Sequence, residues 1–213
     1  MPDTVALVAW LHKDALIAAL DREIASEADD KAALSHEARE KAVAETQADL
    51  LAVERDESWF VWQAQSQGLP VLLHTGTTFI AQAPLEYTLP RHLDRVAMRF
   101  PGAKIIMAHL GHPYEGECVA VARKHPNVYA DISALHYRPF QLYHSLMLVQ
   151  EYGIWDKILF GTDYPFTTVN ATIDGLHRLN GMLEGTNLPR LNTEKIDAMI
   201  HRDTLTLLGL STS

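Results

Sequence analysis

The stretch K-I-I-M-A-H-L-G-H-P, from Lys104 to Pro113, is an apolar run that ends abruptly in two histidines. A short apolar run bounded by turn residues is typical of a buried strand. P-V-L-L-H-T-G at 70–76 and I-L-F-G-T-D-Y-P at 158–165 have the same form. Each run predicts a core strand that delivers a histidine or an aspartate to the loop that follows it.

From residue 70 onward, short apolar runs alternate with helical patterns. The expected strands are 71–74, 104–109, 128–133 and 158–162, and the expected helices are 89–100, 115–124, 139–152, 169–183 and 193–208. Strands that alternate with helices predict parallel βαβ units and an α/β fold. Ligands bind at the carboxyl ends of such strands, so we expect one shared rim carrying His74, His109, Asp131, Ser133 and Asp163. Histidine and aspartate are suitable ligands for zinc or a similar divalent ion.

The first 67 residues have a different composition. Between Pro2 and Gly68 there is no proline or glycine, which favours helix. Ser35 is expected to cap a helix that Gly68 ends, whereas 5–11 fits either a strand or the start of the first helix. The long helix is interpreted as packing on a sheet, with a coiled coil as the alternative. We therefore expect a helical segment at 1–67 and an α/β domain at 68–213.

Composition excludes several classes of protein. The net charge is −9, and residues 1–57 hold 14 Asp or Glu against 6 Lys or Arg, so no basic patch favours nucleic acid. No apolar run is long enough to span a bilayer, and the start lacks the features of a signal peptide. The single cysteine, Cys118, fits a reducing cytoplasm and is interpreted as a buried, inert core residue.

Four motifs, in order, carry a resemblance to a known family. They are V-L-L-H-T-G, F-P-G-A-K-I-I-M-A-H-L-G-H-P, H-P-N-V-Y-A-D-I-S and I-L-F-G-T-D-Y-P. Together they resemble the second half of an amidohydrolase-related metal enzyme of the aminocarboxymuconate semialdehyde decarboxylase branch, over about residues 59–210. The resemblance implies part of a (β/α)8 TIM barrel, with four parallel strands secure, and a divalent metal ion, zinc first and manganese second.

The resemblance also implies roles for single residues. His74 corresponds to a metal ligand, Asp163 to a residue that binds the metal and handles the proton of a water molecule, and His109 to the catalytic acid or base. The implied reaction is hydrolysis or non-oxidative decarboxylation of a small, acidic substrate. His112 precedes Pro113 and is interpreted as a residue that shapes the loop.

Other residues near the rim are candidates from their positions. Arg138 is the arginine expected near this rim, and a guanidinium grips carboxylates in pairs of hydrogen bonds. His136 and Tyr137 are expected to line the same substrate pocket. Asp131 and Ser133 face one side of their strand and either orient His109 or bond to neighbouring backbone. His92, His125, His144, His177 and His201 are interpreted as surface residues.

The sequence departs from the family at its start. The family's first strand ends in His-x-His, which supplies two metal ligands, and this sequence contains no His-x-His. We therefore expect a truncated or rearranged member, and two functions stay open: a metal-dependent enzyme, or a catalytically incompetent protein that acts as an interaction scaffold. Because four strands cannot close an eight-stranded barrel, we also expect a homodimer.

Overall fold

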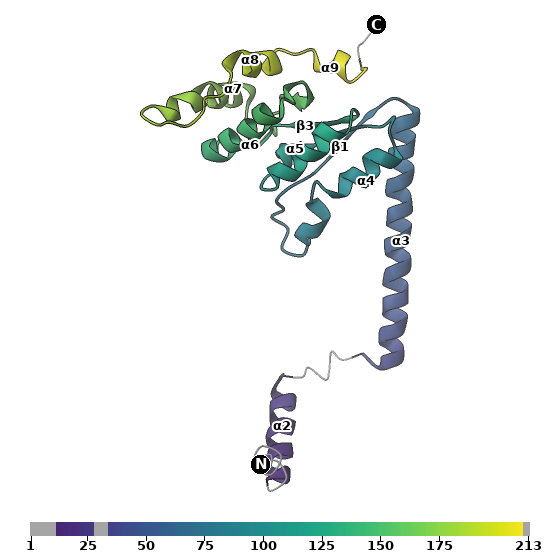
Figure 1. Ribbon diagram of the computed structural model, residues 1–213. Helices are drawn as coiled ribbons and strands as arrows, with labels where there is room; N and C mark the ends of the chain where they lie inside the picture. The colour runs from purple at the N-terminus through teal and green to yellow at the C-terminus, as the bar shows by residue number, and fades with distance from the viewer. Residues whose placement is uncertain (1–11, 28–33, 211–213) are drawn as a thin grey trace, which may run out of the picture. The chain divides into compact units, whose positions relative to one another are not determined.

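The computed structural model describes residues 12–27 and 34–210 (Figure 1). The predicted strand or helix at 5–11 lies outside these ranges. The chain divides into two compact units, residues 1–55 and 56–213, so the last turns of the long helix belong to the second unit. No helix in the described part of the chain is long and apolar enough to cross a membrane.

The first unit is helical where it is described. Helix α2 spans Lys13–Glu27, and helix α3 spans His36–Ser66 and continues into the second unit. Ser35 caps α3, because its Oγ accepts a hydrogen bond from the backbone N–H of Ala38 at 3.1 Å. Gly68 ends the helix with a φ of 67°, a conformation that glycine adopts without steric cost. The predicted bounds of this helix are confirmed.

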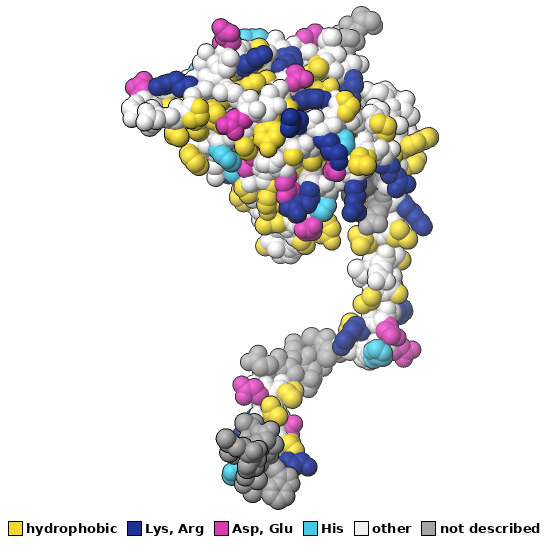
Figure 2. Space-filling model, in the orientation of Figure 1, with side chains coloured by type: hydrophobic (Ala, Val, Ile, Leu, Met, Phe, Trp, Pro, Cys, Tyr) yellow, Lys and Arg dark blue, Asp and Glu magenta, His cyan; other side chains and the backbone are white. Residues whose placement is uncertain are grey.

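The last turns of α3 contact the core of the second unit. Val61 packs partly against the core, and the side chain of Gln65 lies against Gly102. Other apolar side chains of α3 are about half exposed or more, namely Val43, Leu50, Leu51, Val53, Trp59, Phe60 and Trp62. Figure 2 shows hydrophobic side chains along this helix.

The second unit contains a four-stranded parallel sheet in the order β1-β2-β3-β4. The strands are β1 (Pro70–Leu73), β2 (Lys104–Met107), β3 (Val128–Asp131) and β4 (Ile158–Leu159). Leu73 pairs with Met107, and Met107 pairs with Ala130, so the carboxyl ends of these strands lie at one edge. The predicted α/β fold with four parallel strands is confirmed.

Helices connect and cover the strands. They are α4 (His92–Arg99), α5 (Glu115–Lys124), α6 (Pro139–Tyr152), α7 (Val169–Arg178), α8 (Thr193–Ile200) and α9 (Thr204–Leu207). Short 3₁₀ helices lie at Leu85–Thr88, Ala108–Gly111, Trp155–Lys157 and Leu179–Leu183. The helices expected at 115–124 and 139–152 have the predicted bounds. The one expected at 169–183 ends in a 3₁₀ turn, and Asp203, which caps α9, divides the one expected at 193–208.

Alternate residues of β2 face opposite sides of the sheet. Ile105 and Met107 are fully buried in the main core with residues of α4, α5 and α6. Ile106 belongs to a smaller cluster with Leu159 and Leu208, which follows α9. In Figure 1, α9 accordingly lies on the other side of the sheet from α4 and α5. The main core thus fixes the helix layer and holds the strand ends in place.

Candidate active site

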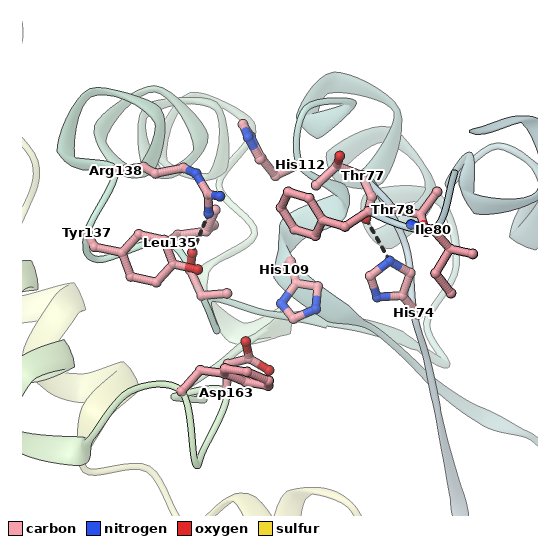
Figure 3. A pocket seen from close by; sticks show the side chains of 13 residues that line it. His74, Thr77, Thr78, Ile80, His109, His112, Leu135, Tyr137, Arg138 and Asp163 are labelled. Carbon is pink, nitrogen blue, oxygen red and sulfur yellow. Dashed lines mark hydrogen bonds between the residues drawn. The ribbon is translucent and has the colours of Figure 1, made fainter. Parts of the chain in front are cut away.

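A cavity of about 510 Å³ lies at the carboxyl ends of the strands (Figure 3). Residues that follow all four strands line it: His74, Thr77, Thr78, Phe79, Ile80, His109, His112, Ala134, Leu135, Tyr137, Arg138, Asp163 and Phe166. Its volume suits a small molecule, since ligand pockets commonly measure 300–1,000 Å³. The structure therefore brings His74, His109 and Asp163 to one cavity.

The backbone is strained at this edge of the sheet. In the described residues, four residues other than glycine have positive φ, and all follow strands: His109 (59°) and Leu110 (48°) after β2, Ala134 (59°) after β3 and Asp163 (69°) after β4. Three of the four line the cavity. Such conformations cost about 1–3 kcal/mol each and cluster at functional sites. These positive φ values could not be predicted from the sequence, because they depend on how the loops close between strands and helices.

His109 is held through its Nδ1 atom. This nitrogen lies 2.8 Å from Ser133 Oγ and 3.2 Å from the carbonyl oxygen of Ser133. The Ser133 hydroxyl donates to Asp131, so both partners of Nδ1 act as acceptors and the ring proton resides on Nδ1. In the neutral ring, Nε2 then keeps its lone pair and can accept a proton.

Asp131 joins this arrangement from the end of β3. Its Oδ1 accepts hydrogen bonds from the backbone N–H of His109 at 3.0 Å and of Ser133 at 2.9 Å. Both Asp131 and Ser133 are buried, which strengthens these bonds. The two roles that the sequence left open are thus both present: the pair contacts the His109 ring and bonds to nearby backbone.

His74 follows β1 and contacts His109 edge to face. The ring centroids are 5.3 Å apart, and the rings are inclined at 66°. His74 Nε2 lies 2.9 Å from the carbonyl oxygen of Thr77, marked by a dashed line in Figure 3. A carbonyl only accepts, so Nε2 carries the proton and Nδ1 holds the lone pair of the neutral ring.

Arg138 and Tyr137 lie across the cavity from His74 in Figure 3. The Arg138 guanidinium stacks over the Tyr137 ring at 4.7 Å and donates from one nitrogen to the Ala134 carbonyl at 3.0 Å. A guanidinium has five N–H donors, so several are free for a ligand. This cation gives the cavity the charge needed to hold an anionic group.

His136 differs from the prediction, because it is not among the residues that line the cavity. Its Cβ lies 2.8 Å from the position that a Cβ on Gly175 would occupy, so this side chain packs against α7. Its Nδ1 is buried without a hydrogen-bond partner. Burial, with a smaller contribution from Arg178, lowers the pKa of His136. The loop after β3 is irregular, so the sequence does not show which way the His136 side chain points.

The cavity also contains residues that the sequence did not indicate. Phe79, Ile80 and Phe166 line it and are 65–88% exposed, forming an apolar rim. His112, interpreted as a loop residue, lines it as well. Cys118 is fully buried, and this burial raises the pKa of its thiol, which fits the inert role.

The predicted metal site depends on how many side chains at the cavity can donate a lone pair to a metal ion. The described residues contain no group of three His, Cys, Asp or Glu side chains placed to hold a metal ion. His74 Nδ1 and the Asp163 carboxylate have the right chemistry, but a zinc site usually takes three or four protein ligands. The described residues alone therefore do not fit a bound metal ion.

The sequence and the fold are similar to those of known proteins. The amidohydrolase family model matches residues 12–196. No curated protein matches the chain by sequence. An uncharacterized TIM-barrel protein from Bordetella bronchiseptica superposes with a TM-score of 0.53 and 24% identity, over 71% of this chain and 49% of that one.

Two further solved structures are similar. A putative metal-dependent hydrolase from Lactobacillus casei has a TM-score of 0.53 and 22% identity, over 71% of this chain and 43% of its own. A probable 2-pyrone-4,6-dicarboxylic acid hydrolase from Acinetobacter baumannii, with citric acid bound, has a TM-score of 0.51 and 15% identity, over 72% and 57%. The chain thus spans about half the length of the structures it matches, and the four strands form part of a TIM barrel.

Proposed function

The chain belongs to the amidohydrolase family, and on this basis we propose that it is a hydrolase or non-oxidative decarboxylase of a small molecule with a carboxylate or carbonyl group. One observation carries the proposal: His109, Asp163 and Arg138 line a single cavity at the carboxyl ends of parallel strands. That edge is where TIM-barrel enzymes place their reacting groups. The motifs that resemble the aminocarboxymuconate semialdehyde decarboxylase branch are compatible with both hydrolysis and decarboxylation, so both reactions are proposed.

Arg138 is proposed to hold the acidic group of the substrate. Its guanidinium is oriented by the Ala134 carbonyl and the Tyr137 ring, so less conformational freedom is lost when it binds a carboxylate. Phe79 and Phe166 would cover the apolar part of the substrate and exclude water. A small acidic compound is the substrate class that fits this lining.

His109 and Asp163 are proposed to move protons. In hydrolysis, the Asp163 carboxylate takes a proton from water as the water oxygen attacks the carbonyl carbon. The protonated His109 then gives its Nε2 proton to the leaving group as the C–O or C–N bond breaks. In decarboxylation, His109 gives that proton to the carbon from which carbon dioxide departs. A positioned acid or base contributes about 10²–10⁴-fold to the rate.

A divalent ion, zinc or else manganese, is proposed only with ligands beyond the donors described above. A homodimer is proposed as the form of the protein, because β1 pairs on one side only among the described strands and Leu72 on it is 62% exposed. A second copy would cover this edge and bring further side chains to the cavity.

The test combines metal analysis with turnover. Protein from cells grown with added zinc or manganese is assayed for metal content and for activity on small carboxylic acids and lactones. We expect His109→Gln and Asp163→Asn to lower turnover at least about 100-fold. His144→Gln, an exposed change on α6, should have no effect. Turnover that survives both cavity variants would reject the assigned roles.

A second function is favoured by the absence of a three-ligand cluster in the described residues and by the exposed apolar side chains of α3. In that case the chain is a scaffold that binds other proteins and performs no catalysis. Neither metal nor turnover in well-folded protein would favour this alternative.

A further inference from the structure

His112, which lines the cavity, forms a buried pair with Glu115 behind it. Their side chains are joined by a 2.6 Å contact between His112 Nδ1 and Glu115 Oε1, and the two residues are only 8% and 5% exposed. Ser145 Oγ of α6 lies 3.4 Å from the same carboxylate oxygen and donates its proton to the Gln141 carbonyl at 2.8 Å. Removing one partner of such a buried pair is costly, because the other is left without compensation. The proposed reaction gives this pair no role.

The backbone of His112 is bonded to the loop after β1. Its carbonyl oxygen accepts a hydrogen bond from the Thr77 N–H at 2.7 Å. Gly76 packs so closely on this carbonyl that a Cβ at Gly76 would lie 2.0 Å from the oxygen. Only glycine fits at this position. Because Gly76 has no Cβ, the two loops can lie in contact.

Thr77 passes this restraint on to His74. Its N–H is bonded to His112, and its own carbonyl oxygen accepts the Nε2 proton of His74. His112 also donates its backbone N–H to the carbonyl of His109 at 2.9 Å. One buried side-chain pair thus anchors a loop segment that is bonded to the His74 ring and to the backbone of His109.

We propose that His112 and Glu115 are positioning residues, which fix the tautomer and orientation of the His74 ring through the backbone of Thr77. This inference deepens the proposed function and rests on it for the importance of His74. The side-chain pair fixes the position of His112, and the His112 carbonyl fixes Thr77 by accepting its N–H. The Thr77 carbonyl then stabilises the Nε2–H tautomer of His74 by accepting its proton.

A second histidine–carboxylate pair lies elsewhere, between His125 and Asp94, a partly exposed carboxylate that also accepts from Lys124. His125 Nε2 lies 2.6 Å from Asp94 Oδ1, and His125 is 7% exposed, in contrast to the surface position predicted for it. His125 follows the C-terminal end of α5 and Asp94 lies on α4, whereas Glu115 begins α5, and neither residue lines the cavity. Loss of this pair should destabilise the fold without changing His74.

The experiment reads the imidazole nitrogens of the ¹⁵N-labelled full chain by NMR at about pH 8, where free histidine is neutral. His74→Gln identifies the His74 signals. We expect the wild-type ring to be in the Nε2–H form, and His112→Leu to lower the ratio of this tautomer to the other about fivefold, as expected for a weakened hydrogen bond. His112→Asn, whose amide nitrogen can replace Nδ1, should restore the ratio.

The control is His125→Leu, which should lower thermal stability and leave the His74 signals unchanged. If His112→Leu fails to fold, Glu115→Met removes the acceptor of His112 Nδ1 with a side chain of similar length and should change the tautomer ratio in the same direction. Unchanged His74 signals in a folded cavity variant, or equal changes in His125→Leu, would overturn the proposal. The measurement requires neither metal nor substrate, so a protein without turnover would contradict the proposed function and leave this result standing.

Discussion

The imidazole rings of His74 and His109 lie edge to face with centroids 5.3 Å apart, although they follow different strands. The contact exists because β1 and β2 pair in parallel, with Leu73 opposite Met107. Each ring is also held by a separate group, His74 by the Thr77 carbonyl and His109 by Ser133. The lone pairs of the two rings are therefore set before any ligand binds.

Ser133 should matter for activity more than for stability. Ser133→Ala removes the hydroxyl that contacts His109 Nδ1, and loss of such a supporting group typically lowers activity 10- to 100-fold. We expect a decrease in turnover of at least about 10-fold and a stability loss of about 1 kcal/mol. The control is Thr172→Val, which removes a buried hydroxyl in α7 that bonds to the Thr168 carbonyl. Equal turnover in the two variants would contradict the role of Ser133.

Ala134 should tolerate glycine. Its φ of 59° costs about 1–2 kcal/mol for a residue with a Cβ, and glycine avoids this cost but loses about 0.5–1 kcal/mol in entropy. We expect Ala134→Gly to raise the free energy of unfolding by up to about 1 kcal/mol. Ala130→Gly, in the buried part of β3, should lower it. Urea denaturation compares the two, and a strongly destabilised Ala134→Gly would mean that its methyl group packs productively.

His136 should make stability depend on pH. Burial lowers its pKa in the folded state, whereas the unfolded chain has the ordinary value of about 6.5. The unfolded state therefore binds a proton more readily, so this contribution to stability is present above about pH 6.5 and is lost as the pH falls through the folded-state pKa. Thermal unfolding at pH 7.5 and 5.5 should show a smaller difference for His136→Phe than for wild type. If the difference between the two pH values were the same in His136→Phe and in wild type, groups other than His136 would account for the pH dependence of stability.

The homodimer is tested by sedimentation at micromolar concentration. Leu72 is exposed on the edge strand β1, and charged side chains on edge strands oppose pairing with another chain. We expect dimers for wild type and for Leu188→Lys, an exposed change away from the sheet, and monomers for Leu72→Lys. A well-folded wild-type monomer would reject the dimer and the shared cavity.

The sequence by itself determined the elements and their order. Periodicity and end signals predicted α5 and α6 to the residue, because Pro139 at the start of α6 and Gly153 after it act locally. The apolar runs located the four strands, and the parallel pattern placed His74, His109 and Asp163 at one edge.

Only the tertiary structure decided how these loops close. The strand predicted at 158–162 ends at Leu159, where its pairing with β3 ends, and the chain turns at Asp163, which has a positive φ. His112 and Glu115 are buried because Glu115 packs against α6, and His136 points away from the cavity because it packs against α7. Such contacts join residues far apart in the chain, and no local pattern records them. The physical reason is that strand and helix positions follow from near-neighbour periodicity, whereas the burial and orientation of loop side chains depend on the whole packed layer.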